Sequence, residues 1–499
     1  MGGASSVSGT RAASIAGASS RAAGYNGPRS WGRSQPLPCP RRIPKMATPR
    51  LLFGDAHGVV YDHPALLAAV RSGDDLLAPT ERPAPLPEGS ALCLLPGRRP
   101  IGIDPTTGEL VTLREVKVGR RTFVPHAVGA TLPPGWTRAL LPAVARKALA
   151  GADDAPVLPQ WAYTAAALGD GGPVVYALHT DRRRHWSTAS HSTPDLGSRV
   201  RARLADRGRA DNPVWRQIAR CALEWRCFTA QNTFYGRDEG AVPSSAACNA
   251  SCVGCLSEQE EGMPPASHER IARPPSAEDM AALAAEHLET ARGRVMVSFG
   301  QGCEGEPLLR WREIAQAIRL VRARTQRGSI NVNTNGSLPQ ALSKLVDAGL
   351  DACRISLNSA SEDLYAAYYR PVGYRLADVV QSMKLARDRG AYLALNLLCF
   401  PGVTDREEEA ERLWRLVAEV GADQVQARSL AIDPDVYMAV ARDRGGQGRA
   451  LGMRALLDGL KHARPGLVIG NFARAKGERG RALPARGGTP QARDRGARP

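Results

Sequence analysis

The sequence predicts an α/β fold: a partial (βα)6 barrel of the TIM-like kind, preceded by a small β-rich or α+β domain. From about residue 242 onward, short apolar runs alternate with amphipathic stretches six times in succession. No glycine-rich dinucleotide-type loop interrupts this series, which favours a barrel over an open, doubly wound sheet. Polar residues recur at every second position of several runs, which indicates that one face of the sheet borders a ligand or water.

The alternation predicts parallel strands joined by crossover helices. The expected strands cover residues 242–246, 294–299, 329–335, 351–359, 392–400 and 423–430. The expected helices cover residues 275–291, 308–326, 338–349, 374–389, 405–420 and 450–463. In such a barrel the chemistry lies at the carboxyl ends of the strands.

The two ends of the chain carry most of its net charge of +17. Residues 1–45 hold seven Lys/Arg and no acid, and residues 471–499 hold eight Lys/Arg and two acids, which leaves residues 46–470 with only +4. Both ends lack the apolar content needed to fold, so we expect a disordered basic N-terminal extension and a disordered basic tail. A transit peptide is one interpretation of the extension; we favour a misassigned start, with Met46 as the first residue.

Three segments with a more ordinary composition lie between these ends. Residues 46–155 contain short apolar runs broken by Pro-Gly and Thr-Thr-Gly turns, which predict the small β-rich or α+β domain. Residues 156–240 predict a mixed strand/helical connecting region, and residues 241–470 the barrel. We expect the N-terminal part to recognise a substrate or to cap the mouth of the barrel.

Charge and cysteine usage restrict the class of protein further. The nearly balanced body does not favour nucleic-acid binding, although a basic tail binds phosphates without sequence preference. No apolar run reaches the roughly 18–20 residues of a membrane span, and no secretory signal peptide is visible. The ten cysteines are mostly scattered along a long chain, which predicts a cytoplasmic protein with reduced thiols and no disulfide framework.

Three cysteines lie close together just after the first expected strand of the barrel. Residues 247–256 read ACNASCVGCL, so Cys248, Cys252 and Cys255 form a C-x3-C-x2-C pattern. A structural zinc site normally has four protein ligands, and Cys303 is a candidate for the fourth. A [4Fe–4S] cluster also takes four cysteines, so three would leave one iron open to bind another group. A zinc-binding structural or interaction module therefore stays open as an alternative to an iron–sulfur enzyme.

The C-x3-C-x2-C pattern at the head of six strand–helix units resembles the radical S-adenosylmethionine (SAM) superfamily. The resemblance implies that the three cysteines hold a [4Fe–4S] cluster whose fourth iron binds the amino and carboxylate groups of SAM. It implies that the reduced cluster cleaves SAM to methionine and a 5′-deoxyadenosyl radical, which abstracts hydrogen from an unknown substrate. It also implies a low-potential electron donor such as flavodoxin or ferredoxin. A radical SAM enzyme that modifies RNA is an alternative within the same superfamily.

Further matches to the superfamily follow along the chain. Glu304-Gly305-Glu306-Pro307 resembles its Gly-Gly-Glu-Pro segment, which binds the SAM amino group, with Glu304 in place of the first glycine. The resemblance assigns four more SAM contacts on later strands: Asn335, Ser356, Asn358 and Asn396. The superfamily often has an aromatic residue before the third cysteine; here that residue is Gly254, so another apolar group, such as Leu256 or Val403, must cover the adenine.

The last expected strand carries candidate substrate contacts. Its polar residues alternate with apolar ones, so they point to the same side of the sheet. They are Gln424, Gln426 and Arg428. The sequence does not assign catalytic roles beyond these contacts.

Overall fold

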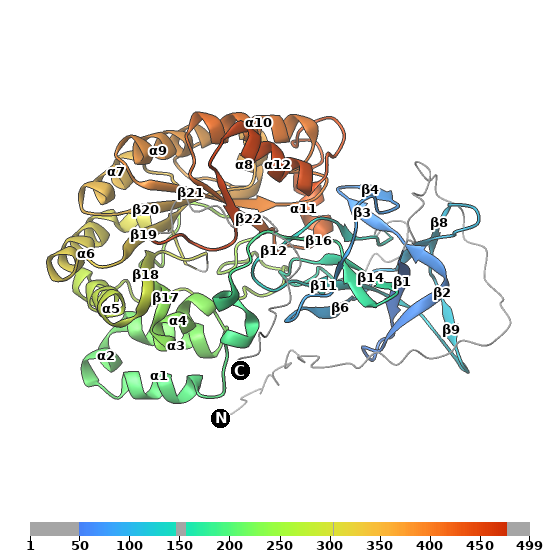
Figure 1. The fold of residues 1–499 in the computed structure, drawn as a ribbon, viewed down its shortest axis with the longest axis horizontal. Coiled ribbons are helices and arrows are strands. Elements are labelled where there is room, and N and C mark those ends of the chain that lie inside the picture. The colour runs from blue at the N-terminus through green and yellow to red at the C-terminus, as the bar shows by residue number, and fades with distance from the viewer. Residues whose placement is uncertain (1–48, 146–155, 303, 477–499) are drawn as a thin grey trace, which may run out of the picture.

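The computed structural model describes residues 49–145, 156–302 and 304–476. Two parts lie next to each other in Figure 1: an antiparallel β-rich N-terminal region and an α/β half-barrel. The predicted N-terminal extension, Cys303 and the predicted tail from residue 477 onward lie outside the described residues.

A parallel sheet of seven strands forms the half-barrel. The strands follow one another in chain order, and every neighbouring pair is parallel. They are β17 (Arg237–Val242), β18 (Arg292–Phe299), β19 (Ser329–Thr334), β20 (Ala352–Leu357), β21 (Tyr392–Cys399), β22 (Gln424–Ser429) and β23 (Val468–Gly470). The predicted α/β fold with a partial parallel barrel is therefore confirmed.

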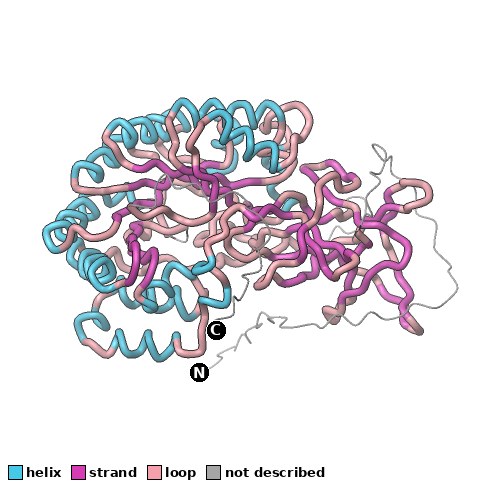
Figure 2. Tube along the Cα trace, in the orientation of Figure 1, coloured by secondary structure: helices cyan, strands magenta, loops and turns pink. Residues whose placement is uncertain are grey.

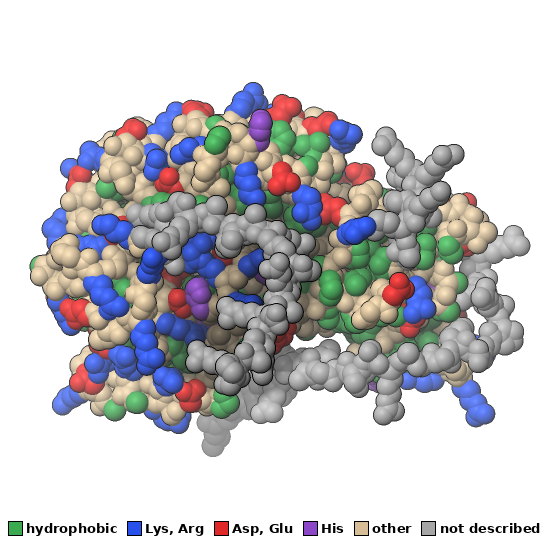
Figure 3. Space-filling model, in the orientation of Figure 1, with side chains coloured by type: hydrophobic (Ala, Val, Ile, Leu, Met, Phe, Trp, Pro, Cys, Tyr) green, Lys and Arg blue, Asp and Glu red, His purple; other side chains and the backbone are tan. Residues whose placement is uncertain are grey.

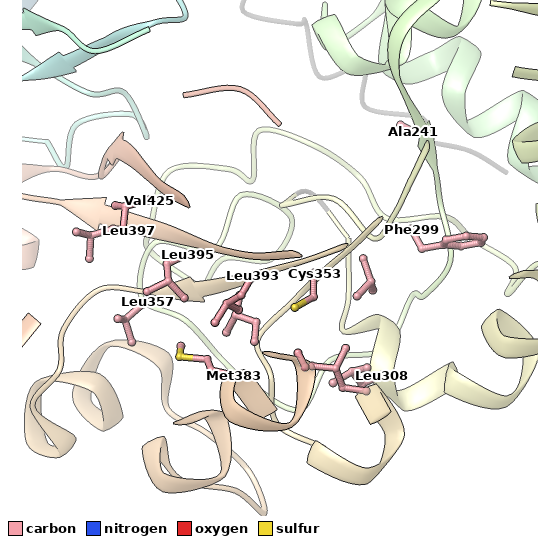
Figure 4. Packing of buried hydrophobic residues seen from close by; sticks show 14 of the residues in the cluster. Ala241, Phe299, Leu308, Cys353, Leu357, Met383, Leu393, Leu395, Leu397 and Val425 are labelled. Carbon is pink, nitrogen blue, oxygen red and sulfur yellow. The ribbon is translucent and has the colours of Figure 1, made fainter. Parts of the chain in front are cut away.

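Helices cover the outer face of this sheet (Figure 2). They are α5 (Ala277–Thr290), η3 (Pro307–Arg310), α6 (Trp311–Arg324), α7 (Pro339–Asp347), α8 (Glu362–Tyr369), α9 (Leu376–Asp388), α10 (Glu407–Glu419), α11 (Pro434–Ala441) and α12 (Met453–Ala463). Each of the longer helices turns an apolar stripe inward; α10, for example, buries Ala410, Leu413 and Val417. Figure 4 shows the resulting core, in which Met383 of α9 lies beside leucines of β20 and β21.

The structure differs from the sequence prediction at the first and last strands. Residues 242–246 were predicted as the first strand, but β17 ends at Val242. Pro243 follows it, and proline has no N–H to continue a ladder. The seventh strand, β23, was not predicted because a three-residue strand is too short to show a periodic pattern.

The N-terminal region contains a nine-stranded antiparallel sheet. Its strands are β1 (Arg50–Gly54), β2 (Val60–Ala68), β5 (Ala84–Pro85), β6 (Ala91–Leu95), β7 (Ile101–Ile103), β8 (Leu110–Thr112), β11 (His126–Thr131), β14 (Thr164–Gly169) and β15 (Gly172–Val175). Because β14 pairs with both β1 and β11, the sheet runs across the boundary that the sequence placed between residues 155 and 156.

Smaller elements complete this region. Its other strands are β3 (Val70–Ser72), β4 (Asp75–Leu77), β9 (Val116–Val118), β10 (Arg121–Phe123), β12 (Trp136–Arg138), β13 (Leu141–Pro142) and β16 (Ala177–His179). The helices between this region and β17 are η1 (Arg184–Trp186), η2 (Thr188–Ser190), α1 (Leu196–Leu204), α2 (Arg207–Asp211), α3 (Pro213–Leu223) and α4 (Phe228–Tyr235). In Figure 1, α1–α4 lie beside the half-barrel, where α3 and α4 pack against β17. The start of α3 follows from its sequence, because Asn212 caps the backbone N–H of Val214 and Pro213 takes the first helical position.

Strand β12 joins the N-terminal region to the carboxyl end of β22. Thr137 Oγ1 donates to the Ala427 carbonyl at 2.8 Å. The backbone N–H of Arg138 donates to Ser429 Oγ at 2.8 Å, and its guanidinium donates to the Leu430 carbonyl at 3.1 Å. The N-terminal region therefore fixes the position of this strand end.

Residues 471–476 pack against the same strand, although the sequence placed them in the basic tail. Asn471, Phe472 and Arg474 are buried. Gln424 Nε2 donates to the Phe472 carbonyl at 2.7 Å, and the Phe472 ring stacks on Trp186 with 4.8 Å between ring centroids. These contacts link β22, the N-terminal region and the segment after β23.

The surface of the half-barrel carries charges of both signs. Figure 3 shows Lys and Arg interspersed with Asp and Glu on the visible face, which agrees with the small net charge of residues 46–470. Within the described ranges, no helix combines the length and the apolar composition needed to cross a membrane.

Candidate active site

A cavity of about 630 Å³ lies at the carboxyl ends of the half-barrel strands. Most of the residues predicted from the sequence line it: Cys248, Cys252, Cys255, Glu304, Gly305, Glu306, Pro307, Asn335, Ser356, Asn396 and Arg428. Segments that precede β17 supply another part of the wall through Pro134, Trp186 and Phe228. One cavity thus collects side chains from distant parts of the sequence.

The three cysteines lie on a loop, residues 243–256, that directly follows β17. This cysteine loop is anchored on the end of α8: the backbone N–H of Val253 donates to the Tyr368 carbonyl at 3.0 Å, and that of Ser251 to the Tyr369 carbonyl at 3.1 Å. Gln160 of the N-terminal region donates to the Cys255 carbonyl at 2.9 Å. The loop is therefore held by the barrel on one side and by the N-terminal region on the other.

The three thiols are reduced and close enough to influence one another. Burial first, and then the charges of Cys255 and Cys248, raises the pKa of the Cys252 thiol. A bound metal cation would reverse this effect, because a coordinating thiol is deprotonated. The Cys252 thiol thus favours its thiolate form when a cation is bound.

This donor set fits an iron–sulfur cluster. Among the described residues, no group of three Cys, His, Asp or Glu side chains converges on a point where it could hold a single metal ion. A [4Fe–4S] cluster does not need such convergence, because each of its cysteines binds a different iron. Cys303, the candidate fourth ligand of a zinc site, lies outside the described residues.

Residues 304–307 run alongside the cysteine loop. The backbone N–H of Gly305 donates to the Ser245 carbonyl at 3.0 Å, and that of Glu306 to the Ala247 carbonyl at 2.7 Å. A Cβ atom at position 305 would lie 2.0 Å from the Ala247 carbonyl oxygen, so only glycine allows this approach. The two segments therefore form one backbone unit around the thiols.

The carboxylates of this segment are buried and bonded internally. Glu304 Oε2 accepts from the backbone N–H groups of Ser244 and Ser245 at 2.7 and 3.4 Å. Glu306 accepts from the Leu308 and Asn335 N–H groups at 2.9 and 2.8 Å. Burial raises the pKa of Glu304 to about 8 and that of Glu306 to about 7. Both side chains thus line the cavity while holding its loops together.

Three of the four predicted SAM contacts on the later strands line the cavity, and the fourth does not. Asn335 bonds back to the cysteine loop through Asn249 Oδ1 at 2.8 Å. Ser356 of β20 and Asn396 of β21 are register partners and line the cavity side by side. Asn358 is buried away from the lining residues, and its Nδ2 donates to the Leu364 carbonyl at 3.4 Å.

Of the three predicted substrate contacts on β22, only one reaches the cavity. Arg428 lines the cavity. Gln426 lies beneath it and accepts a hydrogen bond from the Arg428 guanidinium at 3.0 Å. Gln424 is buried and bonds to the Phe472 carbonyl. The alternation thus found the polar face of the strand, but only its last member reaches the cavity.

Gly254, the position where the superfamily often has an aromatic residue, lies against an aromatic residue from elsewhere in the chain. A Cβ atom at position 254 would meet Tyr368 Oη at 2.9 Å. Tyr368 is buried and lines the cavity together with Gly254 and Leu256. Val403 is buried outside the cavity lining.

Sequence reasoning missed Arg270. Its Nη2 lies 3.8 Å from Cys255 Sγ, and its Nε donates to Ser257 Oγ at 2.9 Å. The guanidinium also pairs with Glu258 at 2.7 Å. A positive charge beside a thiolate favours that thiolate. No motif marks Arg270, which lies in a long irregular segment between the cysteine loop and α5.

Comparison with known proteins bears on the barrel half of the chain. Residues 242–413 match the family model of the radical SAM superfamily. A probable GTP 3′,8-cyclase of Aeropyrum pernix is 30% identical over 180 residues, which cover 35% of this chain and 46% of that protein. A GTP 3′,8-cyclase of Heliobacterium modesticaldum is 32% identical over 162 residues, which cover 32% and 46%. The chain thus spans about half the length of these curated relatives.

Solved structures are similar at lower identity. Coproporphyrinogen III oxidase from Escherichia coli, described as a radical SAM enzyme, is 16% identical with a TM-score of 0.29, over 45% of this chain and 51% of that chain.

A parallel half-barrel with three thiols and a cavity at its strand ends defines a cofactor-dependent enzyme. Residues 242–413, which hold the cysteine loop and most of the half-barrel, are those of a radical SAM superfamily member. This family implies a [4Fe–4S] cluster and SAM as cofactors.

Proposed function

We propose that the cavity is the place where a radical derived from SAM abstracts hydrogen from a small-molecule substrate. The observation that supports this most is the common lining: the cysteine loop, residues 304–307 and the strand-end side chains Asn335, Ser356 and Asn396 all border one cavity. Their order along the chain follows the superfamily, and the match to its family model covers this part of the sequence.

In this proposal Cys248, Cys252 and Cys255 would hold the cluster. When bound and reduced, the cluster would supply the electron that cleaves SAM. The chain itself positions the cofactors: Glu304 and Glu306 fix the backbone around the thiols through their hydrogen bonds to N–H groups. Trp186 and Phe472, stacked at the cavity wall, exclude water from reactive species.

The size of the cavity supports a small substrate. A volume of about 630 Å³ lies within the range of small-molecule sites, and SAM itself takes part of it. The N-terminal region contributes to the wall of this cavity. Residues 46–470 carry a net charge of only +4, which gives little attraction for phosphates, so we do not favour the RNA-modifying alternative. RNA binding by residues 46–476 that does not weaken as salt is added would argue against it directly.

A nucleotide is the second candidate substrate. The curated relatives carry the name GTP 3′,8-cyclase, and the cavity combines an aromatic wall with arginine side chains. Incubation of the reduced enzyme with SAM and GTP tests this candidate. Formation of 5′-deoxyadenosine that increases with GTP would support it, and no change with GTP would remove it.

The experiment for the proposal begins with the anaerobically purified full chain, reconstituted with iron and sulfide. We expect a low-temperature EPR signal in the reduced protein that changes on adding SAM and is absent in Cys252→Ala. Methionine and 5′-deoxyadenosine should form in the presence of dithionite. Stoichiometric zinc without iron would instead support the zinc-binding module.

Two further features belong to the proposal. Enzymes of this superfamily need a reductant, and we propose a low-potential flavodoxin or ferredoxin. We also propose a cytoplasmic location, because reduced cysteine ligands persist in a reducing compartment.

A further inference from the structure

The floor of the cavity contains a buried ion pair that crosses the sheet. Arg354 of β20 places its Nη2 2.9 Å from Glu239 Oε1 of β17. The two side chains are 11% and 7% exposed. Ser298 Oγ also donates to Glu239 Oε1, at 2.5 Å. Arg354 and Ser298 of β18 therefore share the same oxygen of Glu239.

A second arginine lies beside this pair without a carboxylate of its own. Arg428 lies on β22, one strand beyond β21, and lines the same cavity as Arg354 and Glu239. Its guanidinium donates to Gln426 Oε1 at 3.0 Å. Within the described part of the chain, no Asp or Glu oxygen lies within 4.0 Å of it. Burial, and then repulsion by Arg354, lowers the pKa of Arg428 to about 10, although the more distant charges of Glu239 and Asp181 oppose this shift. Arg428 therefore stays protonated at neutral pH.

The other acidic group nearby is already paired. Asp181 of the N-terminal region lies 3.5 Å from Arg474 Nη2, and its Oδ2 accepts from the backbone N–H groups of Asn471 and Phe472. Of the two arginines at the cavity floor, Arg354 and Arg428, only Arg354 forms an ion pair within the described residues. An uncompensated buried charge is costly unless a counter-charge reaches it.

Unpaired donors accompany this surplus charge. Among the described residues, Arg354 Nε and Gln426 Nε2 are buried and have no hydrogen-bond partner. Buried N–H groups are normally satisfied, and orphaned ones at a cavity floor indicate a missing acceptor. Both groups lie next to Arg428 or to its partner, so charge and hydrogen-bonding capacity are missing at the same place.

We propose that Arg354 and Arg428 bind a carboxylate or phosphate group of the substrate. This rests on the proposed function, because it assigns the substrate to the cavity that would hold SAM. The arginine fork matches both oxyanions, and a bidentate contact would satisfy several donors at once. The one other anion expected in this cavity is the carboxylate of SAM, which has the same chemistry. The experiment therefore separates the two sources.

The test uses the full chain and three variants: Arg428→Gln, Arg428→Lys and the surface control Arg449→Gln. Inorganic phosphate and malonate are the probes, each titrated at constant ionic strength by calorimetry and by the shift in thermal unfolding midpoint. We expect wild type and Arg449→Gln to bind a probe equally, Arg428→Gln at least tenfold more weakly, and Arg428→Lys in between. Without a probe, Arg428→Gln should unfold at the same or a higher temperature than wild type, because the surplus charge is gone. A merely structural arginine would lower that temperature.

The measurements with SAM identify which molecule supplies the anion. In reconstituted protein, the EPR change on adding SAM should persist in Arg428→Gln, and SAM-saturated wild type should still bind the probe. Loss of the SAM effect, or competition between SAM and probe, would assign the arginines to the SAM carboxylate and overturn the proposal. Equal probe binding in wild type and Arg428→Gln, or none in wild type, would overturn it too. If the proposed function itself is wrong, the wild-type protein will bind no iron, or its EPR signal will not change on adding SAM. Either result is distinct from the outcomes for the arginine variants.

Discussion

Arg98 of the N-terminal region and Asp433 of the half-barrel form a buried ion pair, with 2.9 Å between Nη2 and Oδ2, across 335 positions of sequence. Their side chains are 4% and 1% exposed. Asp435 extends the contact to Arg71 at 2.6 Å. Asp433 also accepts from the Leu158 N–H at 2.8 Å and caps α11. One carboxylate thus joins both parts of the molecule.

Removing this carboxylate should destabilise the protein strongly. In Asp433→Asn the helix cap is kept, because asparagine caps as well as aspartate. Arg98 loses the more buried of its two carboxylate partners, while Asp435 Oδ2 still lies 3.3 Å from its Nε. We expect the free energy of unfolding in urea to fall by about 1.5–3 kcal/mol. The control Glu407→Gln removes the exposed pair with Arg449 and should cost about 0–1 kcal/mol. Equal losses in both variants would show that the buried pair has no special role.

The sequence predicted the half-barrel well, because its signals are local. Amphipathic helices such as α10 repeat their apolar residues within one turn, and the C-x3-C-x2-C pattern lies within eight residues. The polar alternation on β22 correctly marked one face of that strand. It could not distinguish Arg428, which reaches the cavity, from Gln424, which bonds to the segment after β23.

The remaining site residues depend on contacts between distant segments, which no local pattern records. Trp186 meets Phe472 only because residues 471–476 fold back against the N-terminal region. Arg270 is one of many arginines in a chain with 66 basic residues, so its composition gives no signal. No local pattern marks Tyr368 either, because its place beside Gly254 follows from the packing of α8 on the cysteine loop.

Substitution of Gly305 should disrupt the cysteine loop. The Cβ atom of Gly305→Ala would lie 2.0 Å from the Ala247 carbonyl oxygen, a backbone atom that cannot rotate away. We expect the free energy of unfolding to fall by about 3 kcal/mol and the iron content after reconstitution to drop. Gly302→Ala is the matched control, since its Cβ has no atom within 4 Å and should change stability by less than about 0.5 kcal/mol. Normal iron content and stability in Gly305→Ala would contradict this close contact.

A double-mutant cycle can test the packing of Tyr368 on Gly254. Gly254→Ala alone should cost about 1–3 kcal/mol, because the new methyl group would meet Tyr368 Oη at 2.9 Å. Tyr368→Phe removes that oxygen, so the same alanine should cost less than about 1 kcal/mol in its presence. The coupling, measured by urea unfolding of the four proteins, should therefore be at least about 1 kcal/mol. Additive effects would mean that the ring and the loop do not touch.

The buried Glu304 carboxyl should make stability depend on pH. Burial raises its pKa from 4.5 to about 8 in the folded protein, so between these values the folded state keeps a proton that the unfolded state has released. Stability linked to Glu304 is therefore full below pH 4.5 and is lost as the pH rises through about 8.

The variant Glu304→Gln isolates this contribution. Ser244 and Ser245 both donate to Oε2, and the amide oxygen of glutamine can accept from them in the same way. The variant should lack the part of the decline between pH 5 and 8 that comes from Glu304, a difference of about 2–4 kcal/mol at about 1.4 kcal/mol per unit of pKa difference. Urea unfolding of the metal-free protein at each pH measures it, with the exposed Glu419→Gln as control. Parallel curves for wild type and Glu304→Gln would show that Glu304 is ionised in the folded protein, so that its hydrogen bonds to the cysteine loop outweigh its burial.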